Sequence, residues 1–166
     1  MTQKIMFQFP GQGSQAVGMG GSLAEAFPVA RAVFEEVNDA LGEDLFRLMQ
    51  DGPEDDLRLT RNAQPALFAA SMAALAVLKE KTGKDLSAMA SFVAGHSLGE
   101  YSALAAAGTL AIGDAARLLR LRGDSMQDAV PAGEGAMAAI LGTEEAVIDE
   151  ITAEASAGGV IQLAND

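Results

Sequence analysis

The stretch SFVAGHSLGEYSALAA, residues 91–106, has the pattern of a strand, a sharp turn and a helix. Its first part, Ser91–Ala94, is apolar at the centre and predicts a short buried strand. Gly95-His96-Ser97-Leu98-Gly99 then fits G-x-S-x-G, the pattern of a serine held on a strained turn between a strand and a helix. An alanine-rich helix is expected over Leu98–Ala107. The stretch therefore predicts an α/β fold with a serine exposed above its sheet.

On either side of this turn, the hydrophobic pattern predicts one more strand and several long helices. The expected elements are a strand over Lys4–Phe9, a glycine-rich loop over Gly11–Gly21, a helix from Ser22 to Leu41 with a break near Pro28, a polar surface loop or short turn over Asp51–Asp56, a helix over Asn62–Lys81 that is apolar nearly all round and expected to be buried, and a helix over Ile112–Val130. Strands that alternate with helices support the α/β class.

A second unit is expected after the linker Pro131-Ala132-Gly133-Glu134-Gly135. Its pattern predicts a strand over Ala136–Leu141, a helix over Thr143–Ala155 and a strand over Val160–Leu163. The predicted division is therefore 1–132 for a large unit and 133–166 for the first strand–helix–strand of a smaller one.

Composition excludes several classes of function. The chain has 166 residues and a formal net charge of −12, which argues against nucleic acid and anionic membranes as partners. It contains no cysteine and one histidine, so it has neither a disulfide framework nor a thiol nucleophile nor a multi-histidine metal centre. The start of the chain has no signal-peptide pattern, and the expected location is the cytoplasm.

The predicted turn supplies a nucleophile but no base. Ser97 would be exposed, and the N–H of Leu98 at the helix start could stabilise an oxyanion. His96 cannot serve as the base, because the side chains of adjacent residues on such a turn diverge. We expect His96 to be a buried, hydrogen-bonded residue that supports the turn together with Gly95 and Gly99. A serine nucleophile needs a base. The remaining candidates are carboxylates and lysines, and none has a spacing in the sequence that predicts a position beside Ser97.

The loop Gly11–Ala16 offers an alternative function, because it fits the dinucleotide fingerprint G-x-G-x-x-A after a strand. That reading predicts a helix opening at the loop and an acidic strand end about twenty residues later. The acids at that distance, Glu35 and Glu36, lie inside a helical pattern. A phosphate-binding loop also fails, because Met19 stands where a lysine is needed. The other use of the loop is a backbone N–H, from Gln12, that faces the substrate.

Four motifs, taken together, are more specific than either glycine pattern. They are Phe9-Pro10-Gly11-Gln12-Gly13-Ser14-Gln15, Gln64-Pro65-Ala66-Leu67, Gly95-His96-Ser97-Leu98-Gly99-Glu100-Tyr101-Ser102-Ala103-Leu104 and Arg122-Gly123. In this order and spacing they resemble the malonyl-CoA:acyl-carrier-protein transacylase family. The resemblance implies an α/β-hydrolase-like large subdomain followed by the start of a small ferredoxin-like subdomain.

The resemblance also implies an activity and the residues that perform it. The family transfers a malonyl group from malonyl-CoA to the phosphopantetheine thiol of acyl carrier protein, with no permanently bound cofactor and no metal. Ser97 would form the malonyl ester, and the N–H groups of Gln12 and Leu98 would form the oxyanion hole. Arg122 would bind the malonyl carboxylate, for which a guanidinium is well suited, and Gln64 would line the pocket. Without the resemblance, Arg122 would be interpreted as an ordinary surface arginine.

The chain departs from the family in its length. Family members are longer, and their catalytic histidine lies in a second half that this sequence lacks. We therefore expect an N-terminal fragment that is inactive or non-catalytic when isolated. Acyl carrier protein is itself acidic, so docking would need a local basic patch. The candidates are the helix-end lysines and the helix arginines, namely Lys79, Lys81, Lys84, Arg117 and Arg120, or the missing half.

Overall fold

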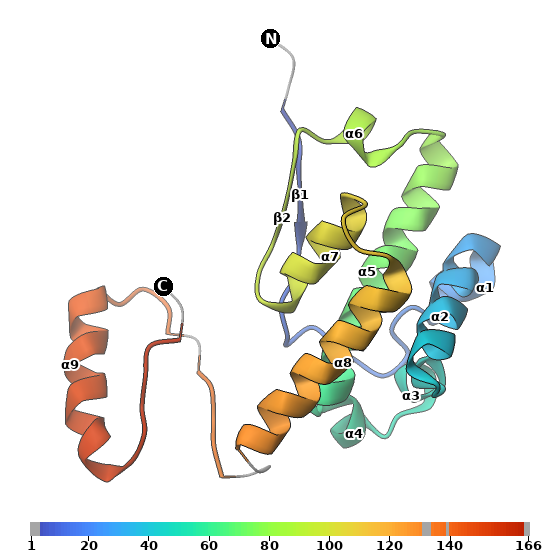
Figure 1. Cartoon of the computed structure of the whole chain (residues 1–166). Coiled ribbons are helices and arrows are strands. Elements are labelled where there is room, and N and C mark those ends of the chain that lie inside the picture. The colour runs from blue at the N-terminus through green and yellow to red at the C-terminus, as the bar shows by residue number, and fades with distance from the viewer. Residues whose placement is uncertain (1–3, 131–133, 139, 165–166) are drawn as a thin grey trace. The chain divides into compact units, whose positions relative to one another are not determined.

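A computed structural model describes residues 4–130, 134–138 and 140–164 of the chain. The chain divides into two compact units, Met1–Ala132 and Gly133–Asp166, and each is described here by itself. The first unit combines a two-stranded sheet with several helices (Figure 1), so the α/β class is confirmed.

The sheet consists of β1 (Met6–Phe9) and β2 (Phe92–Gly95), which run parallel. Met6 pairs with Phe92 and Phe9 pairs with Gly95, so both strands end at the same edge. The loop after β1 and the serine turn after β2 therefore leave the sheet side by side. Both strands occur where the sequence predicted them, although β1 begins at Met6 and not at Lys4.

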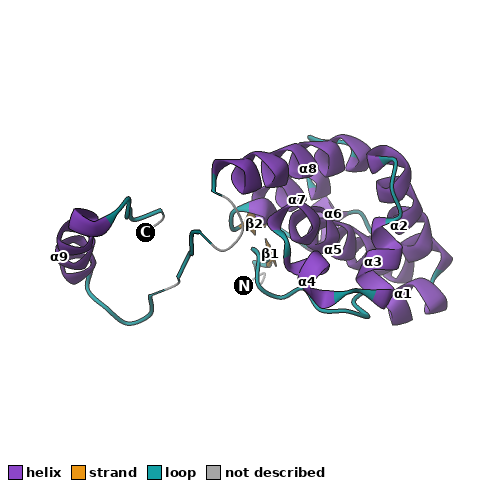
Figure 2. Cartoon of the chain, turned by 90° about the horizontal axis from the view of Figure 1, so that it is seen from below, coloured by secondary structure: helices purple, strands orange, loops and turns teal. Residues whose placement is uncertain are grey.

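Helices supply most of the first unit. They are α1 (Gly21–Ala26), α2 (Pro28–Leu41), α3 (Leu45–Asp51), α4 (Glu54–Arg58), α5 (Thr60–Thr82), α6 (Leu86–Met89), α7 (Leu98–Ala106) and α8 (Ile112–Ala129). Helix α7 lies against both strands, and α5 and α8 pack on each other and on α2 (Figure 1 and Figure 2). Their contacts form one core that includes Phe34, Phe68 and Leu119.

Two helix boundaries follow local chemistry. The expected break near Pro28 is confirmed, because α1 ends at Ala26 and Pro28 opens α2, where its missing N–H costs no hydrogen bond. The predicted surface loop Asp51–Asp56 is wrong in part, since α3 extends to Asp51 and α4 begins at Glu54. Acidic residues in the first turn of α4 favour the start of that helix, and Leu57 within α4 is fully buried.

Helix α5 is buried over only part of its length, contrary to the prediction from its apolar composition. Its buried residues lie between Ala63 and Ala73, and Leu78 near its end is 37% exposed. The later part of α5 borders an open groove. Leu75 and Leu78 line this groove together with residues 6–10, which belong to β1 and the loop after it. Apolar composition predicted a helix here but could not predict which of its faces is covered.

Helices α5 and α8 come into close contact at Gly123, and this contact predicts a stability effect. A Cβ at Gly123 would lie 2.5 Å from the Cα of Arg61 and 2.9 Å from the carbonyl oxygen of Thr60. Because backbone atoms cannot move aside as a flexible side chain can, Gly123→Ala should lower the free energy of unfolding by about 2–3 kcal/mol. Urea denaturation measures the change.

The matched control is Gly113→Ala at the start of the same helix. A Cβ there would lie 3.3 Å from the Cβ of Ala40, a mild contact. The gain in helix propensity, up to about 1 kcal/mol, should offset it. Equal unfolding free energies for the two variants would contradict the close contact at Gly123.

The second unit contains α9 (Glu145–Ala155) and a short 3₁₀ turn over Ser156–Gly158. The predicted helix Thr143–Ala155 is confirmed in its position. The predicted strands are not found over 136–138, 140–141 or 160–163, and Ala139 lies outside the described residues. A strand needs a hydrogen-bonded neighbour, whereas Val160 is 92% exposed and no described residue of this unit pairs with it.

None of the helices described for residues 4–130 and 140–164 is both long and apolar enough to cross a membrane.

Candidate active site

Ser97 occupies a strained turn at the end of β2. Its φ of 54° and ψ of −116° make it the one residue other than glycine with a positive φ in the described part of the chain. Glycines on both sides make this bend possible. A Cβ at Gly95 would collide with the carbonyl of Gly99, and a Cβ at Gly99 would collide with the carbonyl of Phe9. The predicted exposed-serine turn therefore has the expected backbone.

The helix that follows begins with one N–H group, that of Leu98, that its own hydrogen bonds leave free beside the serine. Leu98 is the first residue of α7, so its N–H has no carbonyl partner within the helix. The next two N–H groups are used locally, by Gly99 to the carbonyl of His96 (2.9 Å) and by Glu100 to that of Ser97 (3.1 Å). Gln12 lies in the loop that leaves the same sheet edge after β1. The backbone N–H groups of Leu98 and Gln12 therefore lie at the same edge of the sheet, as two donors to one carbonyl oxygen would need to.

His96 is exposed, and the expectation that it is buried is wrong. Its backbone is what holds the turn, since its N–H bonds to the carbonyl of Phe9 (3.3 Å) and its carbonyl accepts from Gly99. The imidazole lies over Gly11, where a Cβ would be 2.6 Å from Nδ1. Glycine at position 11 leaves room for the ring to lie close to the backbone there, and no hydrogen bond of the ring is found among the described residues. The inference that His96 is not the base of Ser97 agrees with this placement.

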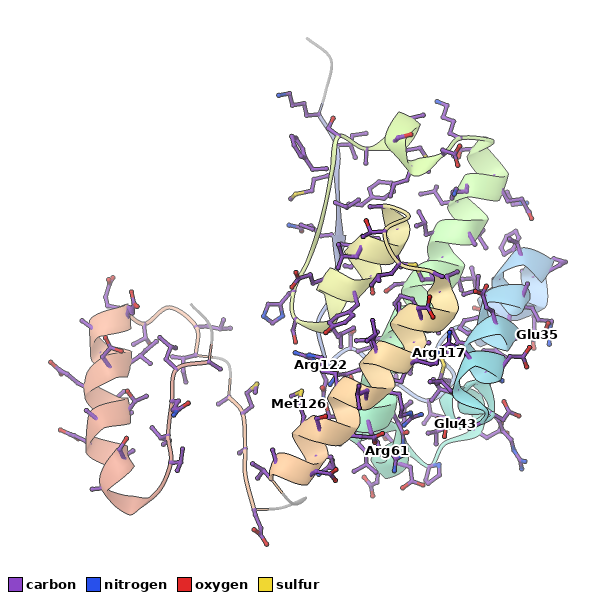
Figure 3. All side chains as sticks on the ribbon, in the orientation of Figure 1. Glu35, Glu43, Arg61, Arg117, Arg122 and Met126 are labelled. Carbon is purple, nitrogen blue, oxygen red and sulfur yellow. The ribbon has the colours of Figure 1, made fainter. Side chains whose placement is uncertain are left out.

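Arg122 is the side chain that contacts the serine. It projects from α8 toward the turn between β2 and α7 (Figure 3), and its Nη2 donates to Ser97 Oγ at 3.0 Å. Its Nη1 donates to Gln64 Oε1 at 2.5 Å, and Gln64 is completely buried in α5. Three predicted residues from three separate elements therefore meet at one point.

The hydrogen bonds continue from Gln64 to the loop after β1. Gln64 Nε2 donates to Thr60 Oγ1 (3.0 Å), and Thr60 donates to Gln12 Oε1 (2.9 Å). Gln64 Nε2 also lies 3.4 Å from the Sδ of Met126, one helical turn after Arg122. Sequence reasoning missed Thr60 as a member of the site. The four-residue spacing of Thr60 and Gln64, which places them on one face of a helix, could have indicated it.

The other arginines of α8 have different partners. Arg120 pairs with Glu43 and donates to Asn62 Oδ1 (2.6 Å), and burial lowers the pKa of its guanidinium while Asp124 opposes that effect. Arg117 pairs with Asp114 on the same helix at 2.5 Å. Of the three, Arg122 is therefore the one placed at Ser97, and the interpretation of Arg122 as an ordinary surface arginine does not hold.

The loop over Gly11–Ala16 does not have the surroundings of a dinucleotide site. The next helix, α1, begins only at Gly21, so no helix N-terminus opens at the loop. Glu35 and Glu36 lie within α2 and not at a strand end. Among residues 4–130, 134–138 and 140–164, no group of acidic or histidine side chains has the arrangement of a metal site.

Comparison with known families decides what kind of domain carries this arrangement. Residues 6–158 match the acyl transferase domain family. The chain belongs to this family. Within it, the chain is 48% identical over 165 residues to the malonyl CoA-acyl carrier protein transacylase of Escherichia coli strain K12, and this match covers 99% of the chain and 52% of that relative.

Solved acyl transferase domains have the same fold. The acyl-carrier-protein S-malonyltransferase of Bartonella henselae superposes with a TM-score of 0.91 at 54% identity, over 99% of this chain and 52% of that one. A malonyl-transacylase solved in complex with a type II polyketide-synthase acyl-carrier protein superposes with a TM-score of 0.85 at 49% identity, over 95% and 50%. The chain therefore spans about half the length of the relatives it matches.

Proposed function

We propose that this acyl transferase chain belongs to an enzyme that moves a malonyl group from malonyl-CoA to the phosphopantetheine thiol of acyl carrier protein. The observation that carries the proposal is the contact between Arg122 and Ser97, 3.0 Å from Nη2 to Oγ. It places a cation within reach of an acyl group bound to the serine. The relatives named malonyl transacylases, which match 99% of the chain, support the choice of malonyl.

The proposed reaction has two halves that share one serine. Ser97 Oγ attacks the thioester carbon of malonyl-CoA, and the negative charge that forms on the carbonyl oxygen faces the N–H groups of Leu98 and Gln12. The C–S bond then breaks, and coenzyme A leaves as its thiol while the malonyl ester remains on Ser97. In the second half, the thiol of acyl carrier protein attacks the ester carbon and the bond from that carbon to Ser97 Oγ breaks. The malonyl group is then a thioester of acyl carrier protein, and the proton lost by the thiol returns to Ser97.

Arg122 would select the acyl group. A malonyl group on Ser97 carries a free carboxylate, and the guanidinium fork of Arg122 matches a carboxylate with two charge-assisted hydrogen bonds. Gln64 holds Nη1 at 2.5 Å, which limits the directions in which the guanidinium can turn. Arg122 Nη2 donates to Ser97 Oγ, and the malonyl carboxylate would take the place of the serine as its partner.

The base for Ser97 is proposed to come from outside these residues. The contact described for Ser97 Oγ is Arg122, which donates and cannot accept a proton. The family resemblance places a catalytic histidine in the half of the relatives that this chain does not span. We therefore expect residues 1–166 alone to transfer malonyl very slowly or not at all.

We also propose how the chain is divided into subdomains. Residues 1–132 would form the N-terminal part of an α/β-hydrolase-like large subdomain, and 133–166 the first part of a ferredoxin-like small subdomain. Cytoplasmic location stays a prediction. The partner would be acyl carrier protein, as in the solved complex of a relative. Of the lysines considered for docking, Lys79 pairs with Asp85 (3.2 Å) and Lys81 lies over the ring of Phe27.

The proposal is tested by incubating the complete protein that carries this chain with malonyl-CoA and the thiol-bearing form of acyl carrier protein. Malonylated acyl carrier protein, identified by its intact mass, is the expected product. A parallel titration with NAD tests the dinucleotide alternative, for which we expect no saturable binding. Saturable NAD binding without malonyl transfer would replace the proposed function.

A further inference from the structure

Thr60 joins two parts of the site that lie far apart in the sequence. It is the first residue of α5, and its hydroxyl contacts Gln12 in the loop after β1 and Gln64 one turn further along the helix. We propose that Thr60 is a positioning residue, whose single hydroxyl holds Gln12 beside the reacting carbonyl and Gln64 beside Arg122. The inference rests on the proposed function and adds a residue to it.

The direction of every hydrogen bond in this chain of contacts follows from chemistry. Arg122 can only donate, so the atom of Gln64 that faces it at 2.5 Å must be the carbonyl oxygen. The amide nitrogen of Gln64 then faces Thr60 and donates to its oxygen at 3.0 Å. The Thr60 proton is therefore free to reach Gln12 Oε1 at 2.9 Å. The hydroxyl of Thr60 thus accepts from Gln64 and donates to Gln12 at the same time, which an apolar side chain at position 60 cannot do.

The Thr60 hydroxyl matters because its partner Gln64 is buried. Gln64 is completely buried, so water cannot readily replace Thr60 as the acceptor for its amide. Without the Thr60 hydroxyl, the buried Gln64 amide nitrogen keeps only the weak sulfur acceptor of Met126 at 3.4 Å. We expect the amide to turn toward a better partner, and the same turn would take Oε1 away from Arg122. Arg122 would then lose the contact that orients its guanidinium toward Ser97.

The backbone of Thr60 is held in place from the other side. A Cβ at Gly123 would lie 2.9 Å from the Thr60 carbonyl oxygen, which shows how closely α8 packs on the start of α5. Arg122 directly precedes Gly123 in α8. The same part of α8 therefore carries the Arg122 guanidinium and packs on Thr60, which acts on that guanidinium through Gln64. This close packing limits how far the backbone of Thr60 can shift toward α8.

Thr60→Val tests the role of the hydroxyl, because valine keeps the branched shape and removes only the polar atom. In the complete protein, kcat/KM for malonyl-CoA should fall about tenfold. That for acetyl-CoA should fall by about threefold, because acetyl depends on the Gln12 loop but not on Arg122. Thr60→Ser, which retains the hydroxyl, should stay within about twofold of the wild type for both substrates.

The matched control is Thr82→Val at the other end of α5, where the hydroxyl donates to the Leu78 carbonyl (2.7 Å) far from Ser97. It should leave both rates unchanged. Equal rates for Thr60→Val and the wild type would overturn the inference, and so would an equal loss for the two substrates. If Thr60→Val does not fold, Thr60→Ala provides the same comparison with a smaller side chain.

A crystal structure of the Thr60→Val protein separates this inference from the proposed function. We expect Gln64 to have turned away from Arg122, and this result would support the positioning role even if the wild type transferred no malonyl. Unchanged side chains of Gln64 and Gln12 would overturn the inference while leaving the proposed function standing.

Discussion

Ser97→Ala should reduce malonyl transfer to acyl carrier protein by a factor on the order of 10⁴ or more, because no ester can form without the nucleophile. The turn itself should survive, since its bend depends on the glycines at positions 95 and 99 and on the backbone of Ser97. The change is measured as the initial rate of formation of malonylated acyl carrier protein by the complete protein and its variant.

Ser102→Ala is the matched control for this prediction. Ser102 lies on the same helix as the turn, is completely buried, and has a hydroxyl without a hydrogen-bond partner among the described residues. Removing that hydroxyl should leave the rate unchanged and should not lower stability. A Ser97→Ala protein that transfers malonyl at a rate comparable to the wild type would rule out Ser97 as the nucleophile.

Arg122→Ala should change which acyl group the enzyme prefers. Without the guanidinium the malonyl carboxylate loses its cation, which should cost about 2–4 kcal/mol in transition-state stabilisation for malonyl. Acetyl-CoA has no carboxylate and should lose far less. The measurement is kcat/KM for the two thioesters, compared in wild type and variant.

Arg117→Ala provides the comparison on the same helix, because Arg117 is exposed and pairs with Asp114 and not with the site. Its ratio of malonyl to acetyl transfer should equal that of the wild type. A fall by the same factor for malonyl and acetyl in Arg122→Ala would mean that Arg122 is structural and does not select the acyl group.

The local pattern around Ser97 was predictable from the sequence for a physical reason. The turn needs glycine at two positions and apolar residues before it, and these demands can be read directly from residues 91–99. The helix break at Pro28 was predictable for the same reason, since proline restricts the backbone wherever it occurs. Arg122 and Gln64, in contrast, were identified only through the family resemblance.

What the sequence did not predict depends on contacts between distant segments. The imidazole of His96 lies over Gly11, and these two residues are brought together by the pairing of β1 with β2. Thr60 joins the site because α5 starts beside the loop that contains Gln12. The expected strands are not found at residues 136–138, 140–141 and 160–163, because an apolar run forms a strand only where a partner strand is available.

The most direct test of the account is to mix the complete protein with malonyl-CoA in the absence of acyl carrier protein and to map the bound malonyl group by peptide mass spectrometry. We predict that the malonyl mass is found on the peptide that contains Ser97 and is absent from the Ser97→Ala protein. A malonyl group on any other residue, or one that persists in Ser97→Ala, would contradict it.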